Sequence, residues 1–467
     1  MMMRCDELRE VLGAELRGPA DVSFDTVGTD SRAVAAGMLF VALRGDRFDA
    51  HEFVADALSS GAVAALVDKQ GAERLGDVGA TLVVVPDTRV ALARLAGHWR
   101  ERFAIPVLGV TGSNGKTTVK EMCASILGVA FGADAVLATR GNLNNEIGLP
   151  LTLLGLRAHH RAAVIEMGMN RPGEIAALTR IARPTVAIVT NAQRAHLEGL
   201  GSTEEVAREK AFIYTAGSAD ATAVINADDP HAAYWRSQLA GRRTLSFGLE
   251  GQAEVRGRAM LHGLGARLEL ESFVGRASIS LGVPGLHNVR NALGAAAACL
   301  AAGVALPAVV AGLEAYRGTR GRLQKSIGPR GATVIDDSYN ANPDSVRAAV
   351  DVLAALPGRR VLVLGDMGEV GETSAQVHDE IGGYAKSKGI EALLSLGDMS
   401  QLAARNFGEG GQHFGSVEAL VGALLPMLTA DAVVLVKGSR FMRMERVLDA
   451  LAAAGDGAGA KEDSDAA

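Results

Sequence analysis

Residues Gly109–Met122, with the sequence GVTGSNGKTTVKEM, are the most informative segment of the chain about its fold. It continues an apolar strand, IPVLGV, and leads into a run of residues that form helices readily. Gly112 and Gly115 allow the backbone to curl so that successive N–H groups point toward anionic oxygens. Lys116 can reach the β- and γ-phosphates of a nucleotide, and Thr117 can offer its hydroxyl to Mg²⁺. A strand, a Gly-rich loop and a helix in this order predict a phosphate-binding loop in an α/β domain.

This loop departs in one respect from the common pattern G-x-x-x-x-G-K-[ST]. Val110 stands five residues before Gly115, and the leading glycine is one step earlier, at Gly109. A Gly-rich turn with a solvent-facing lysine is therefore the alternative interpretation, but the buried strand before the loop and the helix after it favour ATP or GTP binding. The predicted nucleotide contacts of the loop are Gly112, Ser113, Asn114, Gly115, Lys116, Thr117 and Thr118.

The composition is that of a globular α/β protein with several domains. The chain has 467 residues, of which 48% are hydrophobic and 21% charged, and its formal net charge is −6. This length predicts about three domains. Without an excess of Lys and Arg, we expect no nucleic-acid partner. The three cysteines lie far apart, no signal peptide is apparent, and no apolar run is long enough to span a membrane. A cytoplasmic, reduced protein without a membrane span is expected.

The first two segments of the chain differ in length but share an α/β pattern. Residues 1–85 predict strands at Met38–Gly45, Ala64–Val67 and Thr81–Pro86 and a helix at His51–Ala62. Residues 86–316 begin with a helix at Val90–Phe103. They then carry near-continuous hydrophobic runs, typical of parallel strands buried on both faces, at Ala162–Gly168, Thr185–Asn191 and Ala221–Asp228. Residues 253–281 alternate polar and apolar side chains, which predicts an antiparallel edge hairpin or a small barrel.

A hinge is expected where Gly and Arg cluster, at Tyr316–Gln324. Residues 317–454 then carry four more strand patterns, TVIDDSY, RRVLVLGDM, ALLSLGD and AVVLVKG, separated by helical stretches. This alternation predicts a third doubly wound unit. Residues 455–467 are small and charged, so disorder is expected there.

The loop variant TGSNGKTT resembles the ATP loop of the Mur ligase family, the amide-forming enzymes of peptidoglycan precursor synthesis, which also resemble folylpolyglutamate synthase. The resemblance covers essentially the whole chain: Thr29–Phe53, Gly141–Leu154, Val164–Ile175, and the stretches GLHNVRNALGAAA, DDSYNANPDS, LGDMGEVGE and VLVKGSR. It implies a three-domain α/β fold. A smaller α/β N-terminal substrate domain would precede a central P-loop domain with a doubly wound, mostly parallel sheet, and a Rossmann-like C-terminal domain would follow.

Within the family, GNLNNEIGLP and DDSYNANPDS favour the activity that adds D-alanyl-D-alanine to a UDP-N-acetylmuramoyl-tripeptide. No D-N-P-R motif occurs, which argues against the diaminopimelate- or lysine-adding activity, and the TDSR segment argues against the folate enzyme. The resemblance implies ATP and Mg²⁺ as cofactors and an acyl-phosphate intermediate, and a monomer is expected. A nucleotide-switched regulator or a dinucleotide-binding protein is the rival of a different class.

Three segments depart from the family pattern. Ala50 replaces a usual glycine before His51, Phe441 follows KGSR where a small residue is usual, and Gln193-Arg194 stand where small residues are commoner. None of these changes removes a chemical group that the reaction needs. They therefore bear on the substrate side and not on the reaction class.

The resemblance implies a metal site made of Thr117, Glu166, His196 and a carbamylated Lys210. Glu166 ends an apolar strand, so its carboxylate would open toward the ligand crevice. From the residues alone, Glu166 could equally be a surface group and His196 a packing residue. Lys210 could be a solvated helix residue paired with neighbouring glutamates.

The resemblance also implies roles for residues near the expected nucleotide. Asn291 would contact adenine, although it could instead cap or occupy a helix. Arg322 would reach the phosphates from the third domain, and Asp337 would bind ribose, a role that the adjacent Asp336 could take. Catalysis is thereby assigned to Lys116, His196, Lys210 and Arg322.

The substrate contacts that the resemblance implies fall in all three domains. Ser31 and Arg32 would lie on the uridine side, and Asn142 and Asn145 would belong to the central substrate loop. The incoming dipeptide would meet the C-terminal domain through Tyr339, Asn340, Asn342, Lys437, Gly438 and Ser439. A polar loop at the end of a strand is the alternative interpretation of this last group.

Overall fold

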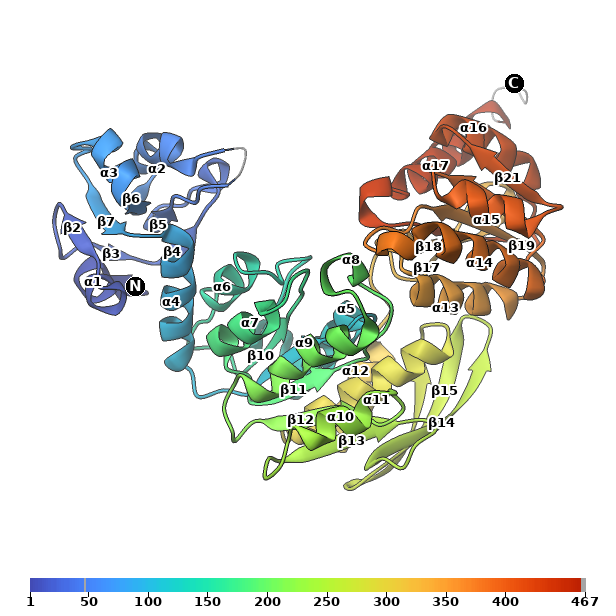
Figure 1. The fold of residues 1–467 in the computed structure, drawn as a ribbon, viewed down its shortest axis with the longest axis horizontal. Coiled ribbons are helices and arrows are strands. Elements are labelled where there is room, and N and C mark those ends of the chain that lie inside the picture. The colour runs from blue at the N-terminus through green and yellow to red at the C-terminus, as the bar shows by residue number, and fades with distance from the viewer. Residues whose placement is uncertain (46–47, 463–467) are drawn as a thin grey trace.

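The computed structural model describes residues 1–45 and 48–462 and arranges them in three units along an arc (Figure 1). The N-terminal and C-terminal units lie at opposite ends of the central unit. Each unit has its own main sheet, of five, nine and six strands respectively, and a two-stranded sheet lies beside the first. In the described part of the chain, no helix is both long and apolar enough to cross a membrane.

The N-terminal unit is built on a five-stranded sheet that is parallel except at one edge. In spatial order its strands are β2 (Glu15–Arg17), β7 (Thr81–Val85), β6 (Ala62–Asp68), β5 (Met38–Val41) and β4 (Thr26–Gly28), with β2 antiparallel to β7. Strands β1 (Met3–Arg4) and β3 (Ser23–Phe24) form the two-stranded sheet. The helices are α1 (Cys5–Leu12), η1 (Ser31–Ala33), η2 (Ala50–Phe53), α2 (Val54–Ser59) and α3 (Lys69–Leu75).

The three strands expected in this unit are confirmed as β5, β6 and β7, although β5 ends earlier than predicted. The helix expected at His51–Ala62 is instead a 3₁₀ turn followed by the short α2. It ends at Ser59 because Gly61 takes a φ of +116°, which turns the chain into β6. The strands β1 to β4 have only two or three residues each, too few to show a periodic pattern.

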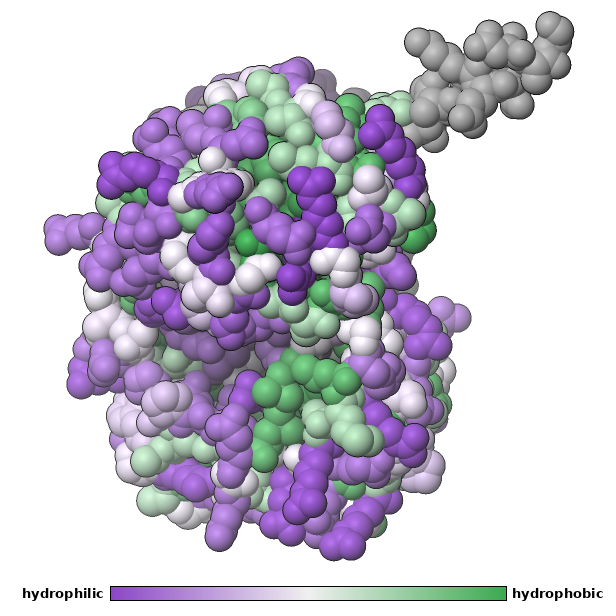
Figure 2. Space-filling view, turned by 90° about the vertical axis from the view of Figure 1, so that its right-hand side faces the viewer, coloured by the Kyte–Doolittle hydropathy of each residue, from purple (hydrophilic) through white to green (hydrophobic). Residues whose placement is uncertain are grey.

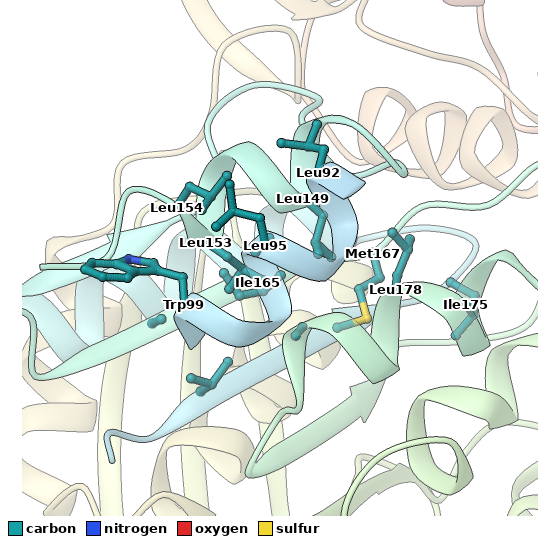
Figure 3. Close-up of a cluster of buried hydrophobic side chains, with 14 of the residues drawn as sticks. Leu92, Leu95, Trp99, Leu149, Leu153, Leu154, Ile165, Met167, Ile175 and Leu178 are labelled. Carbon is teal, nitrogen blue, oxygen red and sulfur yellow. The ribbon is translucent and has the colours of Figure 1, made fainter. Parts of the chain in front are cut away.

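Helix α4 (Thr88–Glu101) anchors the N-terminal unit to the central one. The Asp87 side chain caps its first turn by accepting hydrogen bonds from two backbone N–H groups. Its apolar face presents Leu92, Leu95 and Trp99 to leucines of α6 (Gly148–Leu153) (Figure 3). The indole N–H of Trp99 donates to the Leu156 carbonyl at 3.1 Å. One continuous hydrophobic core therefore runs through both units.

The central unit is a nine-stranded sheet with helices on both faces. In spatial order its strands are β16 (Gly275–Leu281), β15 (Gly265–Ser272), β14 (Val255–His262), β13 (Thr244–Gly248), β12 (Thr222–Asn226), β11 (Val186–Val189), β8 (Val107–Thr111), β10 (Ala162–Glu166) and β9 (Val136–Ala138). The strands from β9 to β14 pair in parallel, and β14, β15 and β16 pair antiparallel, as the alternating pattern at 253–281 predicts.

The predicted burial of the central strands on both faces is confirmed. Alternate residues of β8, β10 and β11 point into two different cores, so Val107 belongs to one and Leu108 to the other. One core lies under α5 (Lys116–Phe131), α11 (Leu286–Ala301) and α12 (Leu306–Ala315). The other helices of this unit are α6, α7 (Glu174–Ala182), α8 (Leu197–Leu200), α9 (Thr203–Thr215) and α10 (Ala232–Ser237), with the 3₁₀ turn η3 (Ala133–Ala135).

The C-terminal unit is a doubly wound sheet of six strands. In spatial order they are β17 (Gln324–Ile327), β18 (Thr333–Asp337), β22 (Ala432–Lys437), β19 (Arg359–Gly365), β20 (Ala392–Leu396) and β21 (Gly411–Phe414). All pairs are parallel except β17 with β18. The α-helices are α13 (Pro343–Ala354), α14 (Ser374–Ser387), α15 (Ser400–Phe407), α16 (Val417–Leu424) and α17 (Glu445–Glu462), with 3₁₀ turns η4 (Pro329–Gly331), η5 (Gly371–Thr373), η6 (Leu425–Met427) and η7 (Arg440–Met442).

The four strands expected beyond the hinge are β18, β19, β20 and β22. The sequence missed the two edge strands, β17 and β21, because neither is buried enough to require an apolar pattern. Helix α17 is described as far as Glu462, and residues 463–467 lie outside the described part, so the disorder expected at 455–467 stays a prediction.

Polar residues cover most of the face on the C-terminal side, and a hydrophobic area lies on the lower lobe (Figure 2). That lobe is the central unit. On the turn ends of its antiparallel strands, large apolar side chains are exposed at Met260, Leu261, Phe273 and Val274.

Candidate functional site

A cleft of about 1430 Å³ runs along the concave side of the three units. Gly45 and Arg89 line it from the N-terminal side, and Asp337 and Lys437 line it from the C-terminal unit. Between them lie the carboxyl ends of the central parallel strands, where ligands bind in open α/β sheets. A cleft with walls from three units can hold more than one ligand at once.

The Gly-rich loop lies between β8 and α5, as predicted, and two of its glycines are sterically required. Gly112 has a φ of +151°, and a Cβ there would lie 1.8 Å from Thr190 Oγ1. Gly115 has a φ of +81°, and its Cβ would lie 2.3 Å from Asn291 Oδ1. No side chain fits at either position. The loop therefore presents bare backbone at the N-terminal end of α5, where an anion is favoured.

Lys116 folds back over this loop. Its Nζ donates to the carbonyls of Gly112 at 2.6 Å and Ser113 at 3.2 Å. Burial lowers the pKa of the Lys116 ammonium, and the nearby Glu166 carboxylate opposes that shift. The alternative of a solvent-facing lysine is wrong for Lys116.

The loop after β11 supports the Gly-rich loop from the side. The Ser113 backbone N–H donates to the Asn191 carbonyl at 3.0 Å, and the Asn114 N–H donates to Asn191 Oδ1 at 2.9 Å. The side-chain amide of Asn114 donates to Gln193 Oε1 at 2.7 Å. Sequence reasoning missed these partners of the loop because they are about 80 positions away in the chain.

Glu166 ends β10 at the base of the cleft and is only 2% exposed. Its Oε1 accepts from the Asn144 side chain at 2.7 Å. Its Oε2 is buried with no hydrogen-bond partner among the described residues. A buried carboxylate oxygen left free in this way fits a bound cation. The alternative of a surface glutamate is wrong, and Asn144 is a partner that sequence reasoning missed between the predicted Asn142 and Asn145.

Lys210 is 1% exposed, so the alternative of a solvated helix residue is wrong. Its neighbour Glu209 accepts instead from the backbone N–H groups of Gly173 and Ile175. The contact recorded for Lys210 Nζ is with Met169 Sδ at 3.8 Å. Burial lowers the pKa of Lys210 well below its usual value, and the charge of Lys116 lowers it further. The surroundings of this amine therefore disfavour its charged form.

His196 lies at the start of α8 with a φ of +59°. Its Nδ1 is 2.7 Å from Glu369 Oε2, a carboxylate that reaches across from the C-terminal unit. Burial lowers the pKa of His196, and the Glu369 contact opposes the shift. The same contact holds the pKa of Glu369 below its usual range. Sequence reasoning gave Glu369 no role, although it lies in the quoted stretch LGDMGEVGE.

Within residues 1–45 and 48–462, no three His, Cys, Asp or Glu side chains are grouped closely enough to hold a metal ion. Glu166 and His196 alone would therefore make an incomplete set. A metal at this position requires ligands of another kind, such as the Thr117 hydroxyl or a chemically altered Lys210.

Arg322 contacts the end of the Gly-rich loop from the start of the C-terminal unit, and Asp337 of that unit lines the same cleft. Arg322 Nη2 donates to Thr117 Oγ1 at 2.9 Å, and its guanidinium lies 4.5 Å from the centre of the Tyr339 ring. Asp337 lines the cleft, whereas Asp336 accepts from the backbone and hydroxyl of Ser338. Of the two aspartates, Asp337 therefore has the position for ligand binding.

Asp337 forms a buried ion pair with Lys437, whose Nζ lies 2.6 Å from Asp337 Oδ2. Lys437 Nζ also donates to the Asn340 carbonyl at 2.9 Å. Burial raises the pKa of Asp337, and Lys437 opposes that shift. Asp337 and Lys437 are therefore ion-paired with each other, although the resemblance implies that Asp337 binds ribose and that Lys437 binds the dipeptide.

Asn291 lies inside α11 and its side chain packs over Gly115, so the helix-cap alternative is wrong. Its Nδ2 donates to Asn288 Oδ1 at 3.1 Å. Asn142 and Asn145 both line the cleft, and Asn145 Oδ1 also accepts from two N–H groups at the start of α6.

The remaining predicted residues are divided between the cleft and its surroundings. Tyr339, Asn340 and Asn342 line the cleft. Ser439 is buried beside it, where its hydroxyl donates to the Ala341 carbonyl and accepts from the Gly368 N–H. Ser31 and Arg32 lie away from the cleft, and Arg32 is 88% exposed and paired with Asp30.

Comparisons with known proteins agree with this geometry. Three family models match the chain: "Mur ligase family, catalytic domain" at residues 23–100, "Mur ligase middle domain" at 110–299 and "Mur ligase, glutamate ligase domain" at 321–440. The UDP-N-acetylmuramoyl-tripeptide–D-alanyl-D-alanine ligase of Escherichia coli is 40% identical over 449 residues, which cover 95% of this chain and 97% of that protein.

Solved structures give the same result. A crystal structure of MurF from Acinetobacter baumannii superposes with a TM-score of 0.88 at 35% identity, covering 96% of this chain and 99% of that one. A MurF ligase from Thermotoga maritima, crystallised in complex with ADP, superposes with a TM-score of 0.79 at 29% identity, covering 91% and 96%. The predicted α/β fold is confirmed.

Proposed function

This chain belongs to the Mur ligase family, and on that premise we propose that it joins D-alanyl-D-alanine to a UDP-N-acetylmuramoyl-tripeptide, with conversion of ATP to ADP. The product is the pentapeptide precursor of peptidoglycan. The main support is the 40% identity with a UDP-N-acetylmuramoyl-tripeptide–D-alanyl-D-alanine ligase over nearly the full length of both chains. A cleft with walls from all three units supports the proposal, because the reaction needs three substrates in one place.

The reaction has to overcome repulsion between a carboxylate and the γ-phosphate of ATP. We infer that the tripeptide carboxylate attacks that phosphate to give an acyl phosphate and ADP, and that the dipeptide amine then displaces the phosphate. Lys116 and the N-terminal end of α5 are placed to neutralise the phosphate charge. Arg322, on the opposite wall, supplies a second positive charge next to Thr117.

Mg²⁺ would be held by Thr117, Glu166, His196 and Lys210, of which Lys210 would act as a carbamate. The free Oε2 of Glu166 supports this proposal. A bound Mg²⁺ would screen the negative charge of the phosphate oxygens. The surroundings of the buried Lys210 favour its uncharged amine, the form that attacks CO₂; the attack forms a C–N bond and releases one proton, which gives an oxygen ligand.

We assign the nucleotide to the space between the central and C-terminal units, with adenine near Asn291 and ribose near Asp337. The MurF ligase of Thermotoga maritima in complex with ADP supports nucleotide use. Asn142 and Asn145 would contact the UDP-sugar peptide, and Ser31 and Arg32 would serve its uridine end from the N-terminal unit. The dipeptide would meet Tyr339, Asn340, Asn342, Lys437 and Ser439.

These roles divide the chain into a UDP-sugar-peptide domain at residues 1–85, an ATP domain at 86–316 and a C-terminal ligase domain at 317–454. The two ends of the cleft would thus receive different substrates. Transfer then takes place over the central Gly-rich loop.

A coupled ADP-release assay with product mass analysis tests the proposal. Sustained release of ADP over many turnovers should require ATP, UDP-sugar tripeptide and D-alanyl-D-alanine together, with the pentapeptide as product. Labelled bridging oxygen in ATP should undergo positional exchange with the tripeptide alone, because the acyl phosphate forms reversibly. ATP hydrolysis at the full rate without the tripeptide would contradict the proposed reaction.

A further inference from the structure

Arg89 carries a positive charge on the N-terminal wall of the cleft. It is the second residue of α4, and it lines the cleft together with Gly45. Within residues 1–45 and 48–112, no other Lys or Arg side chain lines this cleft. Glu146, in the central substrate loop, lines the cleft next to Arg89. An anion bound at this end of the cleft would therefore meet the Arg89 guanidinium.

Contacts at both ends of Arg89 fix its position. Its backbone N–H donates to Asp87 Oδ1 at 2.8 Å, and the Val90 N–H donates to the same oxygen at 3.0 Å. At the far end of the side chain, Nη2 donates to the Arg44 carbonyl at 3.2 Å. Because the Asp87 carboxylate already accepts from the first N–H groups of α4, the helix end itself does not offer them to an anion. The guanidinium is the group that can bind one.

The one carboxylate close to this guanidinium is held loosely. Arg89 Nη1 lies 3.8 Å from Glu146 Oε1, which is too long for a hydrogen bond. The two side chains are 47% and 51% exposed, and an exposed pair at this distance contributes little to stability. A phosphate can therefore take the place of the carboxylate at small cost. The planar fork of a guanidinium matches two oxygens of a phosphate, which a single ammonium group does not.

The other Lys and Arg side chains that line the cleft belong to the central and C-terminal units. Lys116 and Arg322 lie at the Gly-rich loop, where the triphosphate of ATP is assigned. Arg194, Arg290 and Lys437 are paired with carboxylates, and Arg171 follows β10. The proposed sugar-peptide substrate brings a second group of phosphate charges, its diphosphate. Arg89 is the cation that the N-terminal wall offers to it.

We propose that Arg89 binds the diphosphate of the UDP-sugar peptide and thereby selects a sugar that is linked to a nucleoside diphosphate. The identity of this substrate rests on the proposed function. Its uridine end is assigned to the N-terminal unit, and its peptide has to reach the Gly-rich loop, so the diphosphate between them must pass this wall. Ser31 and Arg32 lie away from the cleft and do not line the wall.

Equilibrium binding of UDP and uridine tests the assignment without any turnover. The titrations contain excess ADP, which occupies the Gly-rich loop. The wild type should bind UDP at least about tenfold more tightly than uridine, because only UDP carries the diphosphate. Arg89→Gln should reduce this preference to about twofold without changing the affinity for uridine, and Arg89→Lys should lie between the two. Arg102→Gln, at the other end of α4 and paired with Glu7, is the matched control and should bind as the wild type does.

Three results of these titrations would overturn the proposal. They are equal binding of UDP and uridine by the wild type, a preference for UDP that survives in Arg89→Gln, and an equal loss of both ligands in that variant. The last result would make Arg89 a structural support of the Arg44 backbone. If the enzyme forms no pentapeptide, the proposed function fails, but the titrations still decide the role of Arg89.

Kinetics on the full enzyme separate the diphosphate from the other anionic groups of the substrate. Arg89→Gln should raise the KM for the UDP-sugar tripeptide about tenfold, with kcat and the KM for ATP within about twofold of the wild type. Its melting temperature should stay close to that of the wild type. A lower kcat with an unchanged KM would contradict a binding role. A raised KM together with an intact preference for UDP over uridine would assign Arg89 to a carboxylate of the peptide and overturn the proposal.

Discussion

Lys116, which is half-buried, and Lys210, which is buried, have surroundings that suit different tasks. Lys116 has two carbonyl acceptors and the Glu166 charge near it, so it can remain an ammonium and meet a phosphate. Lys210 is buried and its amine contacts the sulfur of Met169. The positive charge of the nearby Lys116 disfavours a second positive charge on Lys210. The charged form is thus disfavoured more strongly at Lys210 than at Lys116.

Replacing Lys116 tests the phosphate assignment. Lys116→Ala should lower kcat/KM by a factor of about 10² to 10³, since a preorganised charge at the developing transition state is lost. Lys325→Ala, an exposed lysine on β17, is the matched control and should retain activity. Steady-state ADP release with all three substrates measures both. Normal turnover by a folded Lys116→Ala enzyme would remove Lys116 from the site.

Replacing Lys210 tests the carbamate. Lys210→Ala should lose nearly all activity, and acetate should partly restore it, because the lost group would be an oxygen ligand in a closed cavity. Arg208→Ala, an exposed position on the same helix, should be close to wild type. The rate is measured against acetate concentration. An active Lys210→Ala enzyme, or a loss that no small carboxylic acid reverses, would contradict the carbamate.

Among the secondary-structure elements, the sequence correctly predicted the strands that are buried on both faces. The strands at Ala162–Gly168 and Thr185–Asn191 could be recognised from their continuous apolar sequences, because both faces of each strand lie in hydrophobic cores. Edge strands such as β17 were missed because only one neighbour pairs with them and their side chains stay in water. The bounds of helix α4 were predicted to within two residues. Its packing against both the N-terminal and the central unit was not predicted, because an apolar helix face does not indicate which unit it packs against.

Helix α4 supplies a prediction about stability. Leu95→Ala should lower the free energy of unfolding by about 2–5 kcal/mol, because it leaves a cavity in the core shared by two units. Val90→Ala, 56% exposed on the same helix, should cost well under 1 kcal/mol. Urea unfolding followed by tryptophan fluorescence measures the change, since Trp99 lies in that core. Equal effects of the two changes would contradict the shared core.

At the scale of the whole molecule, the site depends on contacts that no local pattern contains. The resemblance could place Asp337 and Lys437 in one unit, but it assigned them to different ligands, and their pairing appears only when strands 100 positions apart become neighbours. Arg194 and Asp344 are 150 positions apart and belong to different units. Glu369 reaches His196 in the same way. The sequence therefore predicted individual candidate groups better than the partners that orient them.

Two histidines whose surroundings disfavour the charged imidazole, the buried His378 and the half-buried His287, make the stability of the whole protein depend on pH. Burial lowers the pKa of His378, and it lowers the pKa of His287 to about 4. His378 must be neutral, because its Nε2 accepts from the Met367 N–H at 2.9 Å. Between the ordinary histidine pKa near 6.5 and the lowered folded values, the unfolded chain binds more protons. Stability is therefore complete above pH 6.5 and falls as the solution becomes more acidic.

This pH dependence can be measured as the melting temperature of the unliganded protein from pH 8 to 5.5. We expect each of the two imidazoles to cost about 1 kcal/mol at the acid end. His378→Gln should have a flatter profile, because glutamine does not titrate, whereas the exposed His262→Gln should keep the wild-type slope. A melting temperature that rises on acidification would contradict the assignment.

Helix α4 packs in a core that two units share, and this limits where related enzymes can be recombined into functional chimeras. Arg94 of this helix donates to the Val11 and Leu12 carbonyls of the N-terminal unit, while Trp99 packs against the central one. After a crossover within α4, the helix would have to pack correctly against both the N-terminal and the central unit. The C-terminal unit has hydrophobic cores of its own and joins at Gly318–Gly321. Chimeras should therefore fold when the crossover lies at those glycines, and the first 316 residues should be inherited as one piece.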